Sequence, residues 1–138
     1  MQAPDYGPPI PLAAAKRVAE AAEAEALKIP SAVVIAVVDS TGHLVVLHRM
    51  DQALYGGVAI AQAKAQTAVD FKRPTKVFEE AVAGGGGGLR FLAAGLCPLE
   101  GGIPLLENGM IIGAIGVAGG AAGQDVQAAA AGARVING

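Results

Sequence analysis

An unbroken apolar run followed by a turn and an alternating segment constrains the fold of this chain most. Residues 33–38 are apolar at every position, which is typical of a strand covered on both faces or of a central strand at a subunit interface. The tetrapeptide Asp39-Ser40-Thr41-Gly42 has the chemistry of a turn, and side chains alternate over 43–50. These features predict an antiparallel hairpin. Its second strand ends in three polar side chains: His48, Arg49 and Asp51.

A second hairpin and several helices follow from the rest of the pattern. Asn108-Gly109 between the apolar runs 103–107 and 110–118 is a strong hairpin signal. Two glycines in the second run, Gly113 and Gly116, predict that another element packs directly on the backbone there. Hairpins separated by helices predict an α+β fold with an antiparallel sheet. Apolar periodicity predicts the helices over 12–28, 58–71, 75–83 and 121–136.

The chain of 138 residues is long enough for one domain with one core. We expect residues 1–10 to form an extended proline-rich arm. The five glycines at 84–88 predict a mobile loop without regular structure, because glycine loses much backbone entropy on folding. Thr75 is placed to cap the third helix.

Composition restricts the partners and the compartment. Apolar residues make up 53% of the chain, but many are alanine and 20 more residues are glycine, so each buried side chain covers little area. A subunit interface would supply further burial, which favours a homo-oligomer. A net charge of −2 without a basic stripe argues against nucleic acid, and no apolar run approaches a membrane span. The single cysteine, Cys97, and the lack of a leader pattern predict a cytoplasmic protein.

Several polar groups could carry chemistry, and each has a plainer alternative. His48, Arg49 and Asp51 could bind an anion or transfer a proton, or could merely cap the strand as an ion pair. Lys64 and Arg73 could contact an anion or face solvent.

The segment Glu100-Gly101-Gly102 could bring backbone N–H groups and a carboxylate base to a ligand, or could form only a tight turn. Glu20 and Glu23 form a Glu-x-x-Glu pair on one helix face, but such pairs are common on surfaces, so we expect no metal site. The glycine run lacks the Lys and Ser/Thr of a phosphate loop.

Three motifs, taken together and in order, resemble the GlcG/HbpS-like haem-binding family. The first comprises 37–44 (VVDSTGHL) and 48–51 (HRMD). The second comprises 61–68 (AQAKAQTA) and 73–75 (RPT). The third comprises 98–104 (PLEGGIP) and 113–117 (GAIGV), so that the resemblance extends from Leu12 to Ile136.

The resemblance implies a profilin-like single domain that forms homo-oligomers, and members include domains that bind haem or occur beside catabolic genes. Haem ligation would fall to His48, His43, Met50 or an oxygen ligand. The motif residues that we expect to contact a ligand are Arg49, Lys64, Thr67, Arg73, Gly101 and Gly102. Those that we expect to act in catalysis are Glu100, Asp51 and His48.

Three functional hypotheses follow. The first is a small-molecule-binding oligomer that binds haem. The second is a cofactor-free acid/base enzyme, of the tautomerase, hydratase or decarboxylase type, acting on a small anionic or carbonyl substrate. The third is a non-catalytic assembly module. All site hypotheses require Arg49, Lys64 and Glu100 to meet around one hollow, within a chain or between subunits.

Overall fold

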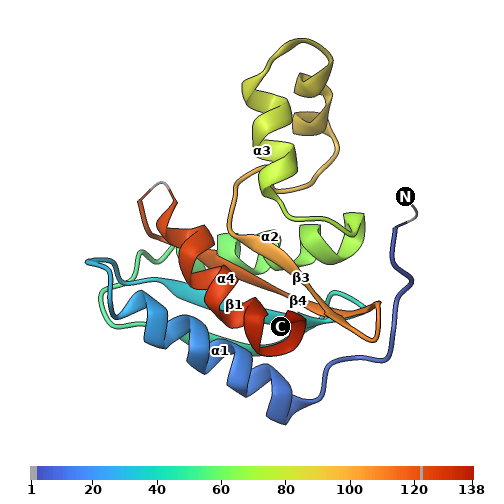
Figure 1. Cartoon of the computed structure of the whole chain (residues 1–138). Helices are drawn as coiled ribbons and strands as arrows, with labels where there is room; N and C mark the ends of the chain where they lie inside the picture. Colours follow the sequence, from blue (N-terminus) through green and yellow to red (C-terminus); the bar gives the residue numbers. More distant parts are fainter. Residues whose placement is uncertain (1–2, 122) are drawn as a thin grey trace.

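Pairs of strands are separated by helices along the chain, as the sequence predicts (Figure 1). The structure is a computed structural model that describes residues 3–121 and 123–138. Its elements are α1 (Leu12–Ala26), β1 (Val34–Asp39), β2 (Leu44–Arg49), α2 (Gly57–Phe71), α3 (Lys76–Ala83), the 3₁₀-helix η1 (Gly86–Ala93), β3 (Gly102–Glu107), β4 (Met110–Ala118) and α4 (Gln124–Asn137). None of the described helices is both long and apolar enough to cross a membrane.

The four strands form one antiparallel sheet in the order β2-β1-β4-β3. Both predicted hairpins are present, and they join through the β1–β4 pair. Asn108 and Gly109 both have positive φ, as the tight turn between β3 and β4 requires. Asp39 accepts hydrogen bonds from the backbone N–H and the hydroxyl of Thr41 in the other turn. The predicted α+β architecture is therefore confirmed.

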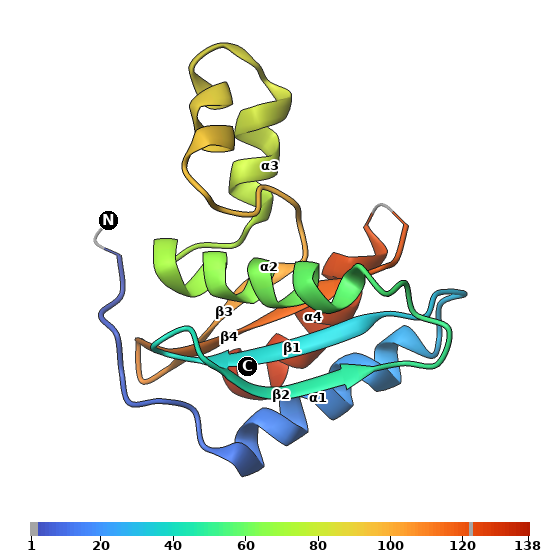
Figure 2. The same cartoon turned by 180° about the vertical axis from the view of Figure 1, so that it is seen from behind.

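Helices cover both faces of the sheet, which explains why the first strand is apolar throughout. Side chains at 33, 35 and 37 join the core under α1 and α4, whereas those at 34, 36 and 38 pack toward α2. Figures 1 and 2 show α1 and α4 on one side of the sheet and α2 on the other. This layering buries β1 almost completely within a single chain.

Helix α2 lies directly on the backbone of β4 at Gly116. A Cβ atom on Gly116 would come within 2.1 Å of the Ala61 carbonyl oxygen and 2.6 Å of the Ala65 nitrogen. No side chain larger than hydrogen fits this contact without displacing the helix. The prediction that a second element packs on the strand glycines is confirmed here, and the contact sets the height of α2 above the sheet.

The described part of the N-terminal arm, residues 3–10, runs beside the start of β4 and forms no helix, whereas residues 1–2 lie outside the described residues. Gly7 donates its backbone N–H to the Ile111 carbonyl, and Ile10 donates to the Ile112 carbonyl. The Tyr6 hydroxyl donates to the Val69 carbonyl at the end of α2. The arm therefore connects the sheet to α2 at the end of β4 where that strand begins.

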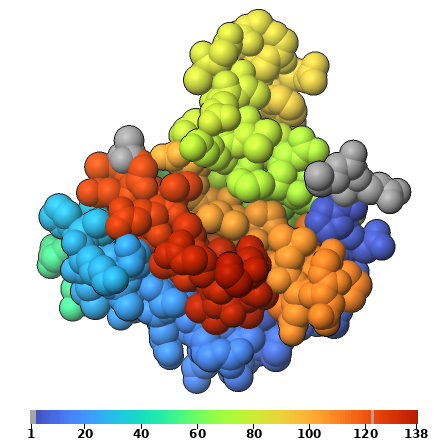
Figure 3. Space-filling view, viewed as in Figure 1, coloured from blue at the N-terminus to red at the C-terminus, as the bar shows by residue number. Residues whose placement is uncertain are grey.

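Helix α3 and η1 project from the body as one arm, which we call the helical arm and define as residues 76–93 (Figures 1 and 3). Edge-to-face contacts join Phe78 to Phe71 at its base and to Phe91 in η1. The prediction that no regular structure occurs at 84–88 is wrong for Gly86–Gly88, because these residues begin η1. The mobility of this segment stays a prediction.

The boundary that differs most from the sequence prediction is the start of the last helix. We expected it at Ala121, but α4 begins at Gln124, after Gly123 with a φ of 84°. Gly123 lies beside the bend that precedes β3, since it donates its backbone N–H to the Glu100 carboxylate at 2.9 Å. Gly120 and Ala121, which precede it, line a hollow at this end of the sheet.

We predict that Gly116→Ala lowers the free energy of unfolding by about 1–3 kcal/mol or more, because its new methyl group would overlap the backbone of α2. Chemical denaturation measures the change. Gly56→Ala is the matched control, since a Cβ there would meet no atom within 4 Å and its φ is −61°. Equal stability of the two variants would contradict the direct contact between α2 and β4.

Candidate functional site

Two hollows lie near the end of the sheet where β2 and β4 end. The larger one, of about 530 Å³, is formed by the loop after β2. The smaller one, of about 220 Å³, lies between α2, α3, the bend before β3 and the loop before α4. The larger hollow is lined by Arg49, Met50, Asp51, Gln52, Ala53, Leu54 and Tyr55. The smaller hollow is lined by Lys64, Glu79, Leu99, Glu100, Gly120, Ala121 and Asp125.

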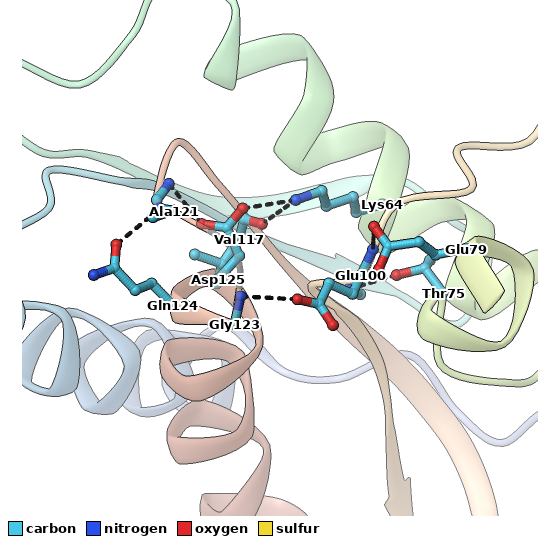
Figure 4. Close-up of polar contacts among 11 residues, drawn as sticks. Lys64, Thr75, Glu79, Glu100, Val117, Ala121, Gly123, Gln124 and Asp125 are labelled. Atoms are coloured by element: carbon cyan, nitrogen blue, oxygen red, sulfur yellow. Dashed lines mark hydrogen bonds and ion pairs between the residues drawn. The ribbon is translucent and has the colours of Figure 1, made fainter. Parts of the chain in front are cut away.

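A buried ion pair forms one wall of the smaller hollow (Figure 4). Lys64 extends from α2, and its Nζ lies 3.0 Å from Asp125 Oδ2 and 2.8 Å from the Val117 carbonyl oxygen. The Lys64 side chain is only 4% exposed and that of Asp125 13%. Asp125 also accepts the backbone N–H of Gly120 at 2.7 Å. The pair thereby connects α2, the end of β4 and the first turn of α4.

Glu100 lies in the bend before β3 and faces the same hollow (Figure 4). Its Oε1 accepts the backbone N–H of Gly123 at 2.9 Å. Its own backbone N–H donates to Glu79 Oε1 at 3.3 Å. The bend, α3 and the loop before α4 are thus connected through two carboxylates, and Lys64 and Glu100 line one hollow as the site hypotheses require.

The Thr75 hydroxyl has a different partner from the one that the sequence predicts. We expected it to cap α3, but its side chain makes no cap hydrogen bond. It is fully buried, and its Oγ1 accepts the backbone N–H of Gly102 at 2.9 Å. That N–H is therefore already satisfied within the chain, and a ligand contact by Gly102 stays a prediction. The sequence signal for this contact was the Arg-Pro-Thr motif (73–75), because its threonine contacts the glycine bend in the folded chain.

Gly101 lets the bend before β3 pack closely against the lysine and β4. Its φ is +122°, and a Cβ there would come within 3.0 Å of Lys64 Nζ and 2.6 Å of the Val117 carbonyl oxygen. Glycine is required for both the backbone conformation and the close approach. The carbonyl of Gly101 accepts the backbone N–H of Val117, which fixes the bend against β4.

The polar groups that end the first hairpin separate from one another. Arg49 and Asp51 are exposed and line the larger hollow. His48 points to the other face of the sheet, where its Nδ1 lies 2.9 Å from Glu23 Oε1 of α1. His43 is exposed beside the turn between β1 and β2. Within one chain, therefore, Arg49 and Lys64 line two different hollows.

A family model described as "Haem degrading protein HbpS-like" matches residues 10–134. The chain belongs to this HbpS-like family. It is 43% identical over 104 residues to protein GlcG of Escherichia coli K12, which is 75% of this chain and 76% of that protein. Both the family and the fold implied by the sequence motifs are thereby confirmed.

Two solved structures of relatives have the same fold as this HbpS-like chain. A crystal structure of HbpS has a TM-score of 0.85 and 34% identity, covering 96% of this chain and 93% of that one. A structure described as the PduOC:haem complex has a TM-score of 0.82 and 30% identity, covering 94% of this chain and 96% of that one.

Two further motif residues of this HbpS-like chain lie outside both hollows. Thr67 is buried, and its Oγ1 accepts the backbone N–H of Cys97 at 2.9 Å. Burial raises the pKa of the Cys97 thiol, although the nearby Lys64 charge opposes the shift, so the thiol stays protonated near neutral pH. Arg73 is exposed, and its Nε donates to the Phe71 carbonyl. Ligand contacts by Thr67 and Arg73 therefore stay predictions.

The described residues offer no metal centre in this HbpS-like chain: no three His, Cys, Asp or Glu side chains among residues 3–121 and 123–138 are grouped to hold an ion. Glu23 is engaged with His48, while Glu20 is exposed.

We predict that Lys64→Met lowers the free energy of unfolding by about 3–5 kcal/mol, because it leaves the Asp125 carboxylate buried without its ammonium partner. Thermal or chemical denaturation measures the loss. Lys76→Met is the matched control, since the Lys76–Glu80 pair is exposed and 3.9 Å apart and should contribute at most about 1 kcal/mol. If the two variants lose equal stability, the buried pair does not anchor α4.

Proposed function

We propose that this HbpS-like protein binds haem in the larger hollow, at the end of the first hairpin. The observation that carries the proposal is the chemistry of its lining. Haem iron in proteins is held by His, Cys, Met or Tyr, and the hollow contains the thioether of Met50 and the phenol of Tyr55. The match to the HbpS-like family and the fold shared with the PduOC:haem complex support the proposal.

The size and lining of the larger hollow also suit a cofactor. Ligand pockets for molecules of drug size measure about 300–1,000 Å³, so the larger hollow falls within this range and the smaller one falls below it. Leu54 and Tyr55 expose 67% and 86% of their surfaces, which gives an apolar wall for a porphyrin. Arg49 lies at the same hollow and can pair with a propionate carboxylate. The residues present therefore fit haem.

In this proposal each residue has a distinct role. If haem is bound, Tyr55 would hold the iron through its phenolic oxygen, Met50 would be the alternative ligand, and Arg49 would pair with a propionate carboxylate. The loop position keeps the hollow open to solvent, so exchange of the cofactor is expected. When bound, haem supplies an iron centre for electron transfer or oxygen chemistry.

We predict that one equivalent of hemin gives a shifted Soret band with the full chain and that Tyr55→Phe abolishes or displaces this shift. Met50→Leu should weaken binding less, by several-fold, if Tyr55 is the ligand. Absorbance titration measures both effects. Stability should be unchanged, because the Tyr55 side chain is almost fully exposed.

His43→Ala is the control for the hemin titration. His43 is exposed at the opposite end of β2 from Arg49, and it lines neither hollow. No shift at stoichiometric hemin would remove the proposal. A shift that survives Tyr55→Phe and disappears with His48→Ala would keep haem binding but move the site to the α1 face.

The helical arm supports the further proposal of a homo-oligomer. It packs mainly on itself, and Phe78 is the buried residue of α3, whereas the described part of η1 buries none. Val77, Leu89 and Leu92 are exposed along it. An apolar projection of this kind is typical of a surface that another subunit covers, and the small-residue core favours the same arrangement.

We predict that the double variant Leu89→Ser/Leu92→Ser lowers the molar mass of the oligomer in solution toward that of one chain, because it removes exposed apolar surface from the helical arm. Light scattering coupled to size exclusion measures the mass. Leu27→Ser is the control, since Leu27 is exposed after α1 and outside the arm. A monomeric wild-type chain, or an unchanged mass in the double variant, would refute the proposal.

The acid/base enzyme stays a second hypothesis, supported by Glu100 and Lys64 lining the smaller hollow. Its proposed anion clamp of Arg49 and Lys64 requires the two hollows to be joined across a subunit interface, since they are separate in one chain. A cytoplasmic location is part of the proposal and is supported by the single cysteine.

A further inference from the structure

We propose that the smaller hollow is a second binding site, which takes a small uncharged or cationic molecule. This molecule would offer a neutral oxygen, from a carbonyl or hydroxyl group, to Lys64. It would offer a hydroxyl or ammonium donor to the carboxylates of Glu79 and Glu100. The inference concerns binding and depends neither on haem in the larger hollow nor on catalysis.

Lys64 has a hydrogen-bond donor to spare at the wall of the hollow. Its ammonium carries three N–H groups, and the described residues supply two acceptors, the Val117 carbonyl and Asp125 Oδ2. The side chain is almost fully buried, and it lines the hollow. Because Lys64 lines the hollow, a ligand placed there can reach its remaining N–H. A neutral oxygen of a ligand would complete the ammonium's hydrogen bonds.

The two glutamates have acceptor capacity to spare. Each carboxylate accepts about four hydrogen bonds, whereas Glu79 and Glu100 each receive one from the backbone of the described residues. Both are half-buried and both line the hollow (Figure 4). They lie on the side of the hollow formed by α3 and the bend before β3. A donor group of the ligand therefore has partners opposite Lys64.

The charge of the lining selects against anions. One ammonium, that of Lys64, faces three carboxylates: Glu79, Glu100 and Asp125. Because Asp125 already neutralises Lys64, the two glutamates leave an excess of negative charge in a partly desolvated space. An anionic ligand would be repelled, a neutral one tolerated and a cation attracted. This reverses the charge preference expected from Lys64 and Arg49 alone.

The volume limits the ligand to a few non-hydrogen atoms, because about 220 Å³ is below the usual range for drug-sized ligands. A purely structural role of the Lys64–Asp125 pair explains the connection between α2 and α4. It does not explain why Glu79 and Glu100 border the same hollow with unused acceptors. Buried ion pairs are also often no more stabilising than apolar side chains, so stability alone gives little reason for this one.

Three probes of matched size and different charge test the proposal: 2-amino-1,3-propanediol as the cation, glycerol as the neutral compound and glycerate as the anion. The full chain labelled with ¹⁵N is titrated with each to millimolar concentration, and the amide shifts of Gly101, Gly120 and Gly123 are followed. We expect saturable shifts with the cation, weaker binding of glycerol, and binding of glycerate weaker than that of the cation by about tenfold or more.

Glu100→Gln is the decisive variant, because it removes one charge while keeping the size and the acceptor oxygen. It should weaken the cation about tenfold and leave glycerol nearly unchanged, and Glu79→Gln should act in the same direction. Glu107→Gln is the control, since Glu107 is exposed on β3 and does not line the hollow. The spectrum of each variant reports whether it is folded.

Three results would overturn the inference. These are no saturable shift at the three glycines with any probe, glycerate binding as tightly as the cation, and a cation affinity that Glu100→Gln and Glu79→Gln both leave unchanged. A hemin titration of the same sample reads the larger hollow separately, so failure at one site is distinguishable from failure at the other.

Discussion

The contact between α2 and the backbone of β4 at Gly116 controls most of what this structure can do. Because Ala61 and Ala65 present backbone atoms to a residue without a side chain, the helix lies unusually close to the sheet. Lys64 precedes Ala65 in the same turn, so its side chain leaves the helix beside the strand and reaches the Val117 carbonyl. A helix held further away by a larger residue would not place that ammonium at the end of β4.

The buried lysine in turn organises the end of the sheet. Its partner Asp125 lies in the first turn of α4 and also fixes Gly120 before that helix. Across the hollow, Glu100 is held by Gly123 of the same loop. The Lys64–Asp125 ion pair, the residues before α4 and the glycine bend therefore depend on one another. Burying an ammonium costs free energy, and this cost is offset only while all these partners are present. The larger hollow is lined mostly by exposed side chains of the loop after β2.

The structure brings some of the residues singled out in the sequence to one end of the sheet and separates others where strand orientation decides. Lys64 lies on α2, which packs on β4, and Glu100 lies in the bend before β3, which pairs with β4. Lys64 and Glu100 therefore line one hollow. His48 and Arg49 are adjacent in sequence, yet they point to opposite faces, as alternation along a strand requires. Thr75 was misjudged because its hydroxyl had two plausible partners, a helix end and a distant glycine, and only the fold brings Gly102 to it.

The two hairpins, the helices between them and the family were predictable from the amino-acid sequence, because turn residues, apolar periodicity and ordered motifs are local properties of the chain. The glycines of β4 also indicated that another element packs on that strand. The division of the polar residues between two hollows, and the 3₁₀-helix that the glycine run begins in a projecting arm, became visible in the folded chain. These depend on which face each strand residue takes and on how closely helices approach the sheet, and both are settled by packing between segments far apart in the chain.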